Sequence, residues 1–259
     1  LQEINMENKT VLYHRQKDVG IITLNRPHRL NAINLDLLKG FMEQLDRAKQ
    51  DTKARVIILT GEGKAFCAGE DLKETASGKS MEQWMDEAQR LQDVQRMTMK
   101  LGKPIIAAMS GYALGGGCEF AMGCDIRIAS ETAVLGFPET TVGMTVTNAG
   151  TKLLPHLVGL GKAKELVLTG DFIDAFEAQR IGLVNKVVAP ENLMTESMAM
   201  AEKIASRSPL ATSLSRTALD QGMEASFDQI MELEKSHLLI CVQAGTEFVG
   251  KRLKEMKEN

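Results

Sequence analysis

Residues 103–125 read KPIIAAMSGYALGGGCEFAMGCD, and this stretch decides the fold. The apolar run Ile105–Met109 predicts a buried strand, which a Ser-Gly pair ends. Glycines then occupy positions 115–117, and the segment Glu119–Met122 predicts the beginning of a helix. The sequence therefore predicts a strand, a glycine turn and a helix in direct succession.

The glycine turn has both a functional and a structural interpretation. Without side chains, glycines allow backbone N–H groups at a helix start to approach a ligand closely. Glu119 falls in the first turn among apolar residues, and such surroundings tend to raise a carboxyl pKa toward the range useful for proton transfer. Turn glycines are also common in proteins, and a first-turn glutamate stabilises the helix dipole. The stretch alone leaves both interpretations open.

The N-terminal part of the chain repeats the alternation of strand and helix. Apolar runs at Val19–Leu24 and Arg55–Thr60 predict buried strands. Asn34 or Asp36 is suited to cap a helix between them. The apolar residues at helical spacing in that helix are Leu38, Phe41, Met42, Leu45 and Ala48. A strand, a helix and a strand in this order predict a parallel crossover and an α/β fold.

The segment 61–73 contains Gly61 and Gly63, which suggest a dinucleotide-binding loop. A third glycine at the required spacing is missing and no helix is predicted there, which argues against a Rossmann site. Residues Met81–Leu101 predict a polar-rich helix that holds the only tryptophan. Its expected core positions are Met85, Leu91, Val94 and Met97. The small polar residues Thr75–Ser80 before it are interpreted as either a mobile lid or an ordinary surface connection.

A second carboxylate follows a second short strand. Asp125–Ala129 and Val134–Glu139 both predict strands, and Pro138 is suited to begin a helix. Glu119 and Glu139 thus each lie where a strand gives way to a loop or helix. In open α/β sheets ligands bind at that end of the strands. Two carboxylates in one cleft are the arrangement that paired acid–base chemistry requires.

From residue 148 onward the pattern is helical, interrupted by a predicted strand at Val184–Val188. About the last 70 residues lack any sheet pattern and predict a helical appendage, whose apolar stripes are typical of core or subunit interface. In the helix predicted between Asp36 and Lys53, basic side chains are offset by acidic ones. The formal net charge of −3 likewise disfavours a nucleic-acid-binding relative, and no apolar run is long enough for a membrane helix.

The cysteines are Cys67, Cys118, Cys124 and Cys241, without a CxxC pair or histidines at ligand spacing, so we expect reduced thiols and no metal site. A cytoplasmic location follows, or the mitochondrial matrix after removal of a transit peptide. Because the chain begins with Leu1, we expect a processed or artificial start, with Met6 a candidate for the natural one. No signal peptide is visible.

The chain resembles the crotonase (enoyl-CoA hydratase/isomerase) superfamily from about Val19 to Arg252. The motifs that carry the resemblance are GKAFCAGEDL at 63–72, GYALGGGCE at 111–119, FPE at 137–139, LTGD at 168–171 and GLVNKVV at 182–188. Together these motifs are highly specific, although each alone is moderately so.

The resemblance implies a spiral of repeated ββα units with a C-terminal helical trimerisation region. It divides the chain into a core at residues 1–190, which carries the acyl-CoA site, and a helical oligomerisation region at 191–259. It further implies an acyl-CoA thioester substrate, no cofactor, and a homotrimer or dimer of trimers. Binding of nucleic acid or membrane is not implied.

Site residues follow from the matched motifs. The backbone N–H groups of Ala68 and Gly116 would form an oxyanion hole, and Glu119 and Glu139 would be the catalytic carboxylates. The residues implied in contact with substrate or coenzyme A are Lys64, Ala65, Phe66, Ala68, Asp71, Leu72, Gly115 and Gly116. Preorganised N–H donors stabilise the charge that develops on a thioester oxygen, and neither donor needs a side chain.

Hydratases of this family keep both glutamates whereas isomerases typically keep one, so the chain most resembles an enoyl-CoA hydratase. It departs from the family pattern at Glu70, at Thr145–Thr147 and in a shortened segment between residues 235 and 248. These departures keep open the alternatives of a double-bond isomerase, a ring or thioester hydrolase, and a specialised cyclic or dienoyl-CoA hydratase. A trimer that has lost activity is disfavoured because both glutamates are present.

Overall fold

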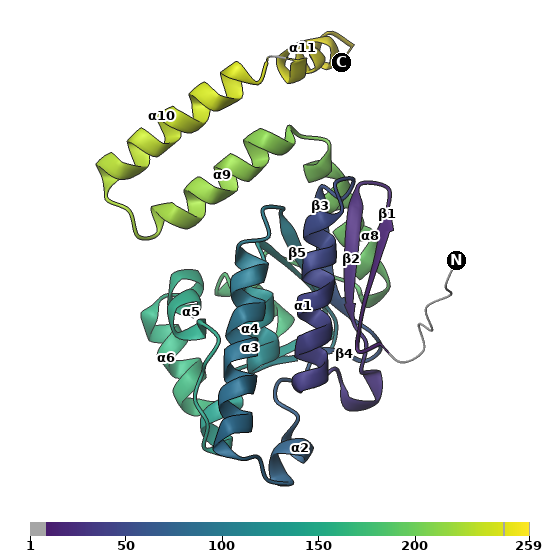
Figure 1. Ribbon diagram of the computed structural model, residues 1–259, viewed down its shortest axis with the longest axis vertical. Coiled ribbons are helices and arrows are strands. Elements are labelled where there is room, and N and C mark those ends of the chain that lie inside the picture. Colours follow the sequence, from purple (N-terminus) through teal and green to yellow (C-terminus); the bar gives the residue numbers. More distant parts are fainter. Residues whose placement is uncertain (1–8, 246, 259) are drawn as a thin grey trace. The chain divides into compact units, whose positions relative to one another are not determined.

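The computed structural model describes residues 9–245 and 247–258 (Figure 1). The chain forms two compact units, Leu1–Ala201 and Glu202–Asn259. The functional division predicted between residues 190 and 191 stays a prediction, and the candidate start at Met6 lies outside the described residues. Among the described helices, none combines the length and apolar character needed to cross a bilayer.

Strands and helices alternate along the first unit as expected, and the elements of both units follow here in chain order. The strands are β1 Val11–Gln16, β2 Val19–Leu24, β3 Val56–Gly61, β4 Ala65–Cys67, β5 Ile105–Met109, β6 Tyr112–Leu114, β7 Ile126–Ser130, β8 Val134–Gly136, β9 Phe172–Asp174 and β10 Lys186–Val188. The helices are α1 Leu35–Gln50, α2 Leu72–Ala76, α3 Met81–Met99, α4 Gly116–Met122, α5 Gly150–Val158, α6 Leu160–Thr169, α7 Ala175–Arg180, α8 Leu193–Ala205, α9 Pro209–Gly222, α10 Phe227–Gln243 and α11 Glu247–Glu258. Short 3₁₀ helices are η2 Pro27–Arg29, η3 Pro138–Val142 and η4 Pro190–Asn192.

One sheet has the strand order β1-β2-β3-β5-β7-β10. Strand β1 is antiparallel to β2, and the other neighbours run parallel. Every residue of β2 and of β5 is buried, which explains why both read as continuous apolar runs. The predicted strands at Val19–Leu24 and Ile105–Met109 and the parallel pairing of β2 with β3 are confirmed.

A second sheet, in the order β4-β6-β8-β9, was not predicted in full. Strands β4, β6 and β8 are parallel, and β9 pairs antiparallel with β8. Of its strands only β8 was expected, within the longer predicted strand Val134–Glu139, because three residues are too few to show a pattern of their own. With this sheet, the ββα repetition implied by the motifs is complete: β1-β2-α1, β3-β4-α2-α3 and β5-β6-α4.

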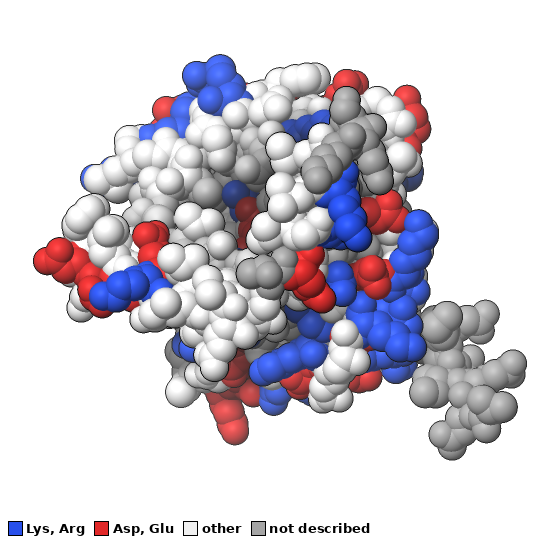
Figure 2. Space-filling model, turned by 90° about the horizontal axis from the view of Figure 1, so that it is seen from above, with Lys and Arg blue, Asp and Glu red and all other residues white. Residues whose placement is uncertain are grey.

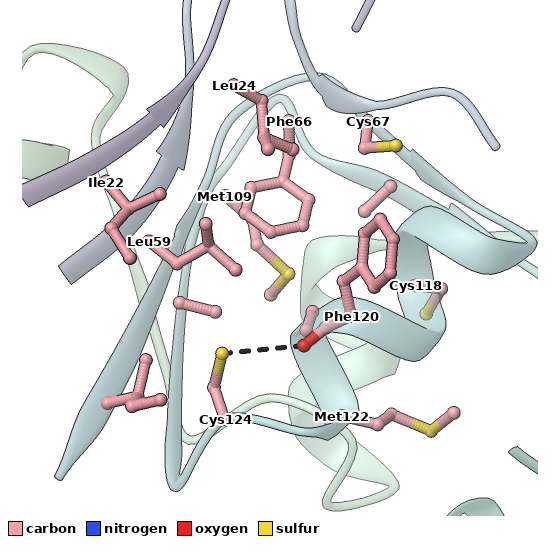
Figure 3. Close-up of a cluster of buried hydrophobic side chains, with 14 of the residues drawn as sticks. Ile22, Leu24, Leu59, Phe66, Cys67, Met109, Cys118, Phe120, Met122 and Cys124 are labelled. Atoms are coloured by element: carbon pink, nitrogen blue, oxygen red, sulfur yellow. Dashed lines mark hydrogen bonds between the residues drawn. The ribbon is translucent and has the colours of Figure 1, made fainter. Parts of the chain in front are cut away.

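Figure 3 shows the core between the strands and α4, and buried residues of α1 belong to the same cluster. Asn34 caps α1 by accepting a hydrogen bond from the Leu37 N–H, as predicted. Phe41 of α1 meets Phe120 of α4 edge to face, with ring centroids 5.3 Å apart. Figure 3 shows Phe66 of β4 beside Met109 of β5, so the same cluster joins both sheets.

One expectation for the middle of the chain was wrong. Met85 is exposed rather than part of the core, although Val94 on the same helix is fully buried. Helix α2 ends at Ala76 and Ser80 caps α3 in a capping box with Gln83, and the two interpretations of Thr75–Ser80, a lid or a surface connection, both stay predictions. The cysteines are free thiols, of which Cys67, Cys118 and Cys124 are buried and Cys241 is half-buried, and burial raises the pKa of the Cys67 thiol to about 12.

The second unit is helical, as predicted. Its helices α9 and α10 pack against each other along their length (Figure 1). No residue of either helix is buried within the described part of the chain. The exposed large apolar side chains of these two helices are Leu210, Leu219, Met223, Phe227, Met231, Leu238, Leu239, Ile240 and Val242. Exposed apolar surface of this extent is typical of interaction sites, and the assembly predicted for this region stays a prediction.

Candidate active site

A cavity of about 560 Å³ opens in the first unit where β4, β6 and β8 end. Its walls are mostly apolar, which is typical of a small-molecule site. The apolar or small lining residues are Ile33, Ala68, Gly69, Leu72, Trp84, Ala88, Leu91, Leu114, Gly115, Gly116, Pro138, Val142, Met144 and Phe172. The remainder are the carboxylates Glu70, Glu87, Glu119 and Glu139 and the threonines Thr141, Thr145 and Thr147.

The structure brings together most of the residues that the motifs singled out. Those that line the cavity are Ala68, Leu72, Gly115, Gly116, Glu119 and Glu139. Lys64 is exposed outside the cavity, and Ala65 and Phe66 are fully buried in β4. Asp71 is buried and forms an ion pair with Arg26, at 3.1 Å, while capping α2. The substrate contacts predicted for these four stay predictions.

Local geometry explains the glycines before α4. Gly115 has φ +51° and ψ −126°, a conformation that residues with a Cβ rarely adopt. A Cβ there would also lie 3.1 Å from Oε1 of Glu139, so the missing side chain leaves room for that carboxylate. A Cβ on Gly117 would overlap the carbonyl oxygen of Cys67, so α4 packs directly on the end of β4.

This packing places the two predicted oxyanion donors on neighbouring elements. Gly116 is the first residue of α4, and its N–H has no acceptor within the described residues. Ala68 follows β4 directly, and its N–H donates to the carbonyl of Leu30 at 3.0 Å. A ligand oxygen would therefore find one donor open and would share or replace the Leu30 carbonyl at the other.

Glu119 is completely buried and held by backbone donors. Its Oε1 accepts hydrogen bonds from the N–H groups of Asn148 at 2.8 Å and Gly150 at 3.0 Å. Burial raises the pKa of Glu119 to about 7, and the charge of Glu139 adds to this, although the backbone hydrogen bonds oppose it. The segment 145–147, flagged as a departure in the sequence, leads directly into these donors.

Glu139 lies in η3, immediately after Pro138. Burial raises its pKa as well. Neither of its carboxyl oxygens, nor Oε2 of Glu119, has a hydrogen-bond partner among the described residues. Two carboxyls of raised pKa, with these oxygens unpartnered in a largely apolar cavity, can share one proton and bind water or a reacting group.

The sequence did not indicate the contribution of α3 to this cavity. Trp84, Glu87, Ala88 and Leu91 line it at positions i, i+3, i+4 and i+7, which is one face of a helix. The available signal was the lone tryptophan at the start of that face. No group of three or more His, Cys, Asp or Glu side chains in the described chain is placed to hold a metal ion.

Comparison with known proteins agrees with this geometry. Residues 14–246 match the family model described as enoyl-CoA hydratase/isomerase. The chain is 41% identical to a short-chain-enoyl-CoA hydratase of Clostridium acetobutylicum, covering 95% of this chain and 97% of the relative. It is 40% identical, with the same coverage, to a crotonyl-CoA hydratase of Syntrophomonas wolfei.

A solved structure gives the same result for the fold. The crystal structure of an enoyl-CoA hydratase from Bacillus anthracis matches with a TM-score of 0.90 and 38% identity over 96% of both chains. The resemblance and the fold class predicted from the motifs are thereby confirmed. The chain belongs to the enoyl-CoA hydratase/isomerase family.

Proposed function

We propose that this protein hydrates short-chain 2-enoyl-CoA thioesters, adding water across the 2,3 double bond. The predicted class of enzyme, an acyl-CoA hydro-lyase, is confirmed by the relatives, which match nearly over their whole length. The observation that carries the proposal is one cavity that holds two coupled, buried carboxyls beside the open N–H at the start of α4.

The thioester carbonyl would accept hydrogen bonds from the Gly116 and Ala68 N–H groups. As the water oxygen bonds to C3, electrons move from the double bond toward C2 and the carbonyl oxygen. The carbonyl oxygen thereby becomes negatively charged. Fixed donors in a low-dielectric cavity stabilise that charge more in the transition state than in the bound substrate. In such sites, removal of one donor typically costs about 10²–10³ in kcat.

Glu119 and Glu139 would handle the protons. Water held between the two carboxyls loses one proton to the ionised carboxylate while its oxygen bonds to C3. The other carboxyl delivers its proton to C2, so that water is added and the pair again holds one proton. The raised pKa of Glu119, at about 7, suits both steps near neutral pH.

The direct test is the spectrophotometric loss of the crotonyl-CoA double bond, with product identified as 3-hydroxybutyryl-CoA. We expect turnover without added metal or cofactor. A matched assay with a 3-enoyl-CoA distinguishes the family's other reaction. Conversion of the 3-enoyl-CoA to its 2-isomer, with no hydration of crotonyl-CoA, would replace this proposal by an isomerase.

The same proposal includes a cytoplasmic location, no bound cofactor, and an acyl-CoA thioester as the substrate. A nucleic-acid partner is not proposed, because acidic and basic side chains lie interspersed on the face shown in Figure 2.

We also propose that the chain assembles as a trimer or a dimer of trimers through its helical unit. The support is the exposed apolar surface on α10, where Leu238 and Leu239 are each 62% exposed. Burying that surface in an assembly would contribute about 25 cal/mol of favourable free energy for each Å² of apolar area removed from water. Sedimentation should give three or six times the chain mass of 28.4 kDa; a monomer at micromolar concentration would contradict the assembly.

A further inference from the structure

A second pair of carboxylates, Glu70 and Glu87, lines the same cavity on its α3 side. Leu91, one helical turn beyond Glu87, lies about 4.0 Å from the Cβ position of Gly116. Glu87 therefore stands about one turn, ~5.4 Å, farther along α3 from the oxyanion glycine. Apart from Glu70 and Glu87, the side chains that line this side of the cavity include the apolar Trp84 and Leu72.

Lys79 links the two carboxylates. Its Nζ donates to Oε1 of Glu70 and to Oε2 of Glu87, both at 2.7 Å, and lies 4.6 Å from the ring centroid of Trp84. Although burial lowers the pKa of Lys79, the hydrogen bonds to the carboxylates raise it overall. Thr75 also donates to Oε1 of Glu70, at 2.6 Å. Lys79 thus bonds both carboxylates, and Oε1 of Glu70 accepts two hydrogen bonds from within the protein.

Glu87 is not fully engaged. Glu87 is only 4% exposed to solvent, and its Oε1 has no hydrogen-bond partner among the described residues. Burial and the charge of Glu70 raise the pKa of Glu87 to about 7, against the opposing effect of Lys79. A buried carboxyl oxygen without a donor costs about 1–3 kcal/mol unless a ligand or water supplies one.

The charge balance of this cluster determines what it can receive. Glu70 and Glu87 share the one ammonium of Lys79, so the cluster carries no spare positive charge for an anionic group, whether Glu87 is ionised or protonated. A terminal carboxylate on the acyl chain would add a like charge in a low-dielectric site. A hydroxyl would donate to Oε1 of Glu87, which is buried without a hydrogen-bond partner among the described residues.

We propose that the acyl pocket ends in a hydroxyl-recognition site at Glu87, supported by Lys79 and Glu70. The preferred substrates are then 2-enoyl-CoA thioesters with a hydroxyl group near the end of a medium-short acyl chain. This inference rests on the proposed hydratase function and specifies its substrate class. It also gives a role to Glu70, which departs from the family pattern.

The test compares hydration of matched enoyl-CoAs with five to seven acyl carbons that end in a hydroxyl, a methyl or a carboxylate. At the chain length that reaches Glu87, we expect kcat/KM of the wild type to favour hydroxyl over methyl by about tenfold, the effect of one net hydrogen bond. The carboxylate should be the poorest substrate. Equal rates for hydroxyl and methyl at every length would overturn the inference.

Two variants separate recognition from structural support. Glu87→Leu should abolish the preference for the hydroxyl, whereas Glu87→Gln, which keeps a carbonyl oxygen at that position, should retain part of it. If Glu87 had a purely structural role, its substitution would lower kcat/KM for all substrates together and leave the ratio between them unchanged. Glu82→Gln makes the same change at an exposed position of α3 outside the cavity and should leave the ratio as in the wild type.

Crotonyl-CoA keeps the two proposals distinguishable. It is too short to place a group at Glu87, so its hydration by the wild type reports the proposed function alone. Hydration of crotonyl-CoA without any hydroxyl preference would refute only the recognition site. Failure to hydrate crotonyl-CoA and all the longer substrates would refute the function itself, and the recognition site with it.

Discussion

Glu119→Gln and Glu139→Gln are each expected to lower kcat for hydration of crotonyl-CoA by about 10²–10⁴, the usual contribution of a general acid–base group. The double variant should be scarcely slower than the poorer single variant, because groups that act as one unit lose activity non-additively. Stopped-flow or steady-state loss of the enoyl absorbance measures all three. Glu131→Gln, at an exposed position in the loop after β7, should leave kcat unchanged.

The physical reason is the coupling of the two carboxyls. The charge of Glu139 helps to raise the pKa of Glu119, so the pair favours holding one proton between its members. A glutamine has no carboxyl proton to give or accept, so replacing either glutamate prevents proton transfer between water, the pair and the substrate. If only one substitution affects activity and the wild type isomerises 3-enoyl-CoA, the paired mechanism is wrong.

A folding control comes from the pH dependence of stability. The pKa of Glu119 rises from 4.5 to about 7 on folding, so the folded protein binds the extra proton between these pH values. The free energy of unfolding contributed by this group is therefore greatest below pH 4.5 and decreases as pH rises through 7, by about 3 kcal/mol at most. Urea midpoints should show this decrease in the wild type and a smaller one in Glu119→Gln.

Gly116→Val is the second substitution with a large expected effect, a loss of about 10²–10³ in kcat/KM. A Cβ at this position lies 2.8 Å from Cδ1 of Ile33, at the flexible end of that side chain, so the fold can adjust. The valine methyl groups would instead fill the space in which the thioester oxygen meets the Gly116 N–H.

The matched control is Gly161→Val in the first turn of α6, where an added Cβ meets no atom within 4 Å. Activity and thermal midpoint of this variant should stay close to the wild type. Circular dichroism and a thermal melt establish that Gly116→Val is folded. Unchanged turnover in folded Gly116→Val would remove Gly116 from the oxyanion hole.

The extent to which the fold could be predicted depends on how each strand is buried. Val19–Leu24 and Ile105–Met109 are covered on both faces, so every residue is apolar or small and the sequence alone marks them as strands. The three-residue strands β4, β6 and β9 owe their conformation to pairing with neighbours distant in the chain. A local pattern cannot report such pairing, and the second sheet was missed for that reason.

The site residues likewise divide into those that a local motif marks and those that come together only in the folded chain. Glu119, Glu139 and the glycine run belong to dense local motifs, so their roles were assigned from the sequence as predictions. Glu87 was not identified because its partners, Glu70 and Lys79, meet it only in the folded chain. The engagement of the Ala68 N–H by the Leu30 carbonyl is equally invisible to a motif, since it joins two loops across the fold.

The order of the second sheet sets the dimensions of the catalytic centre. Ala68 follows β4, Gly116 follows β6 and Glu139 follows β8, and these strands are adjacent and parallel. Backbone pairing holds neighbouring strands about 4.8 Å apart. The pairing of β4, β6 and β8 therefore fixes the spacing of the two proposed oxyanion donors and the proposed catalytic carboxyl through the backbone, independently of the side chains that line the pocket.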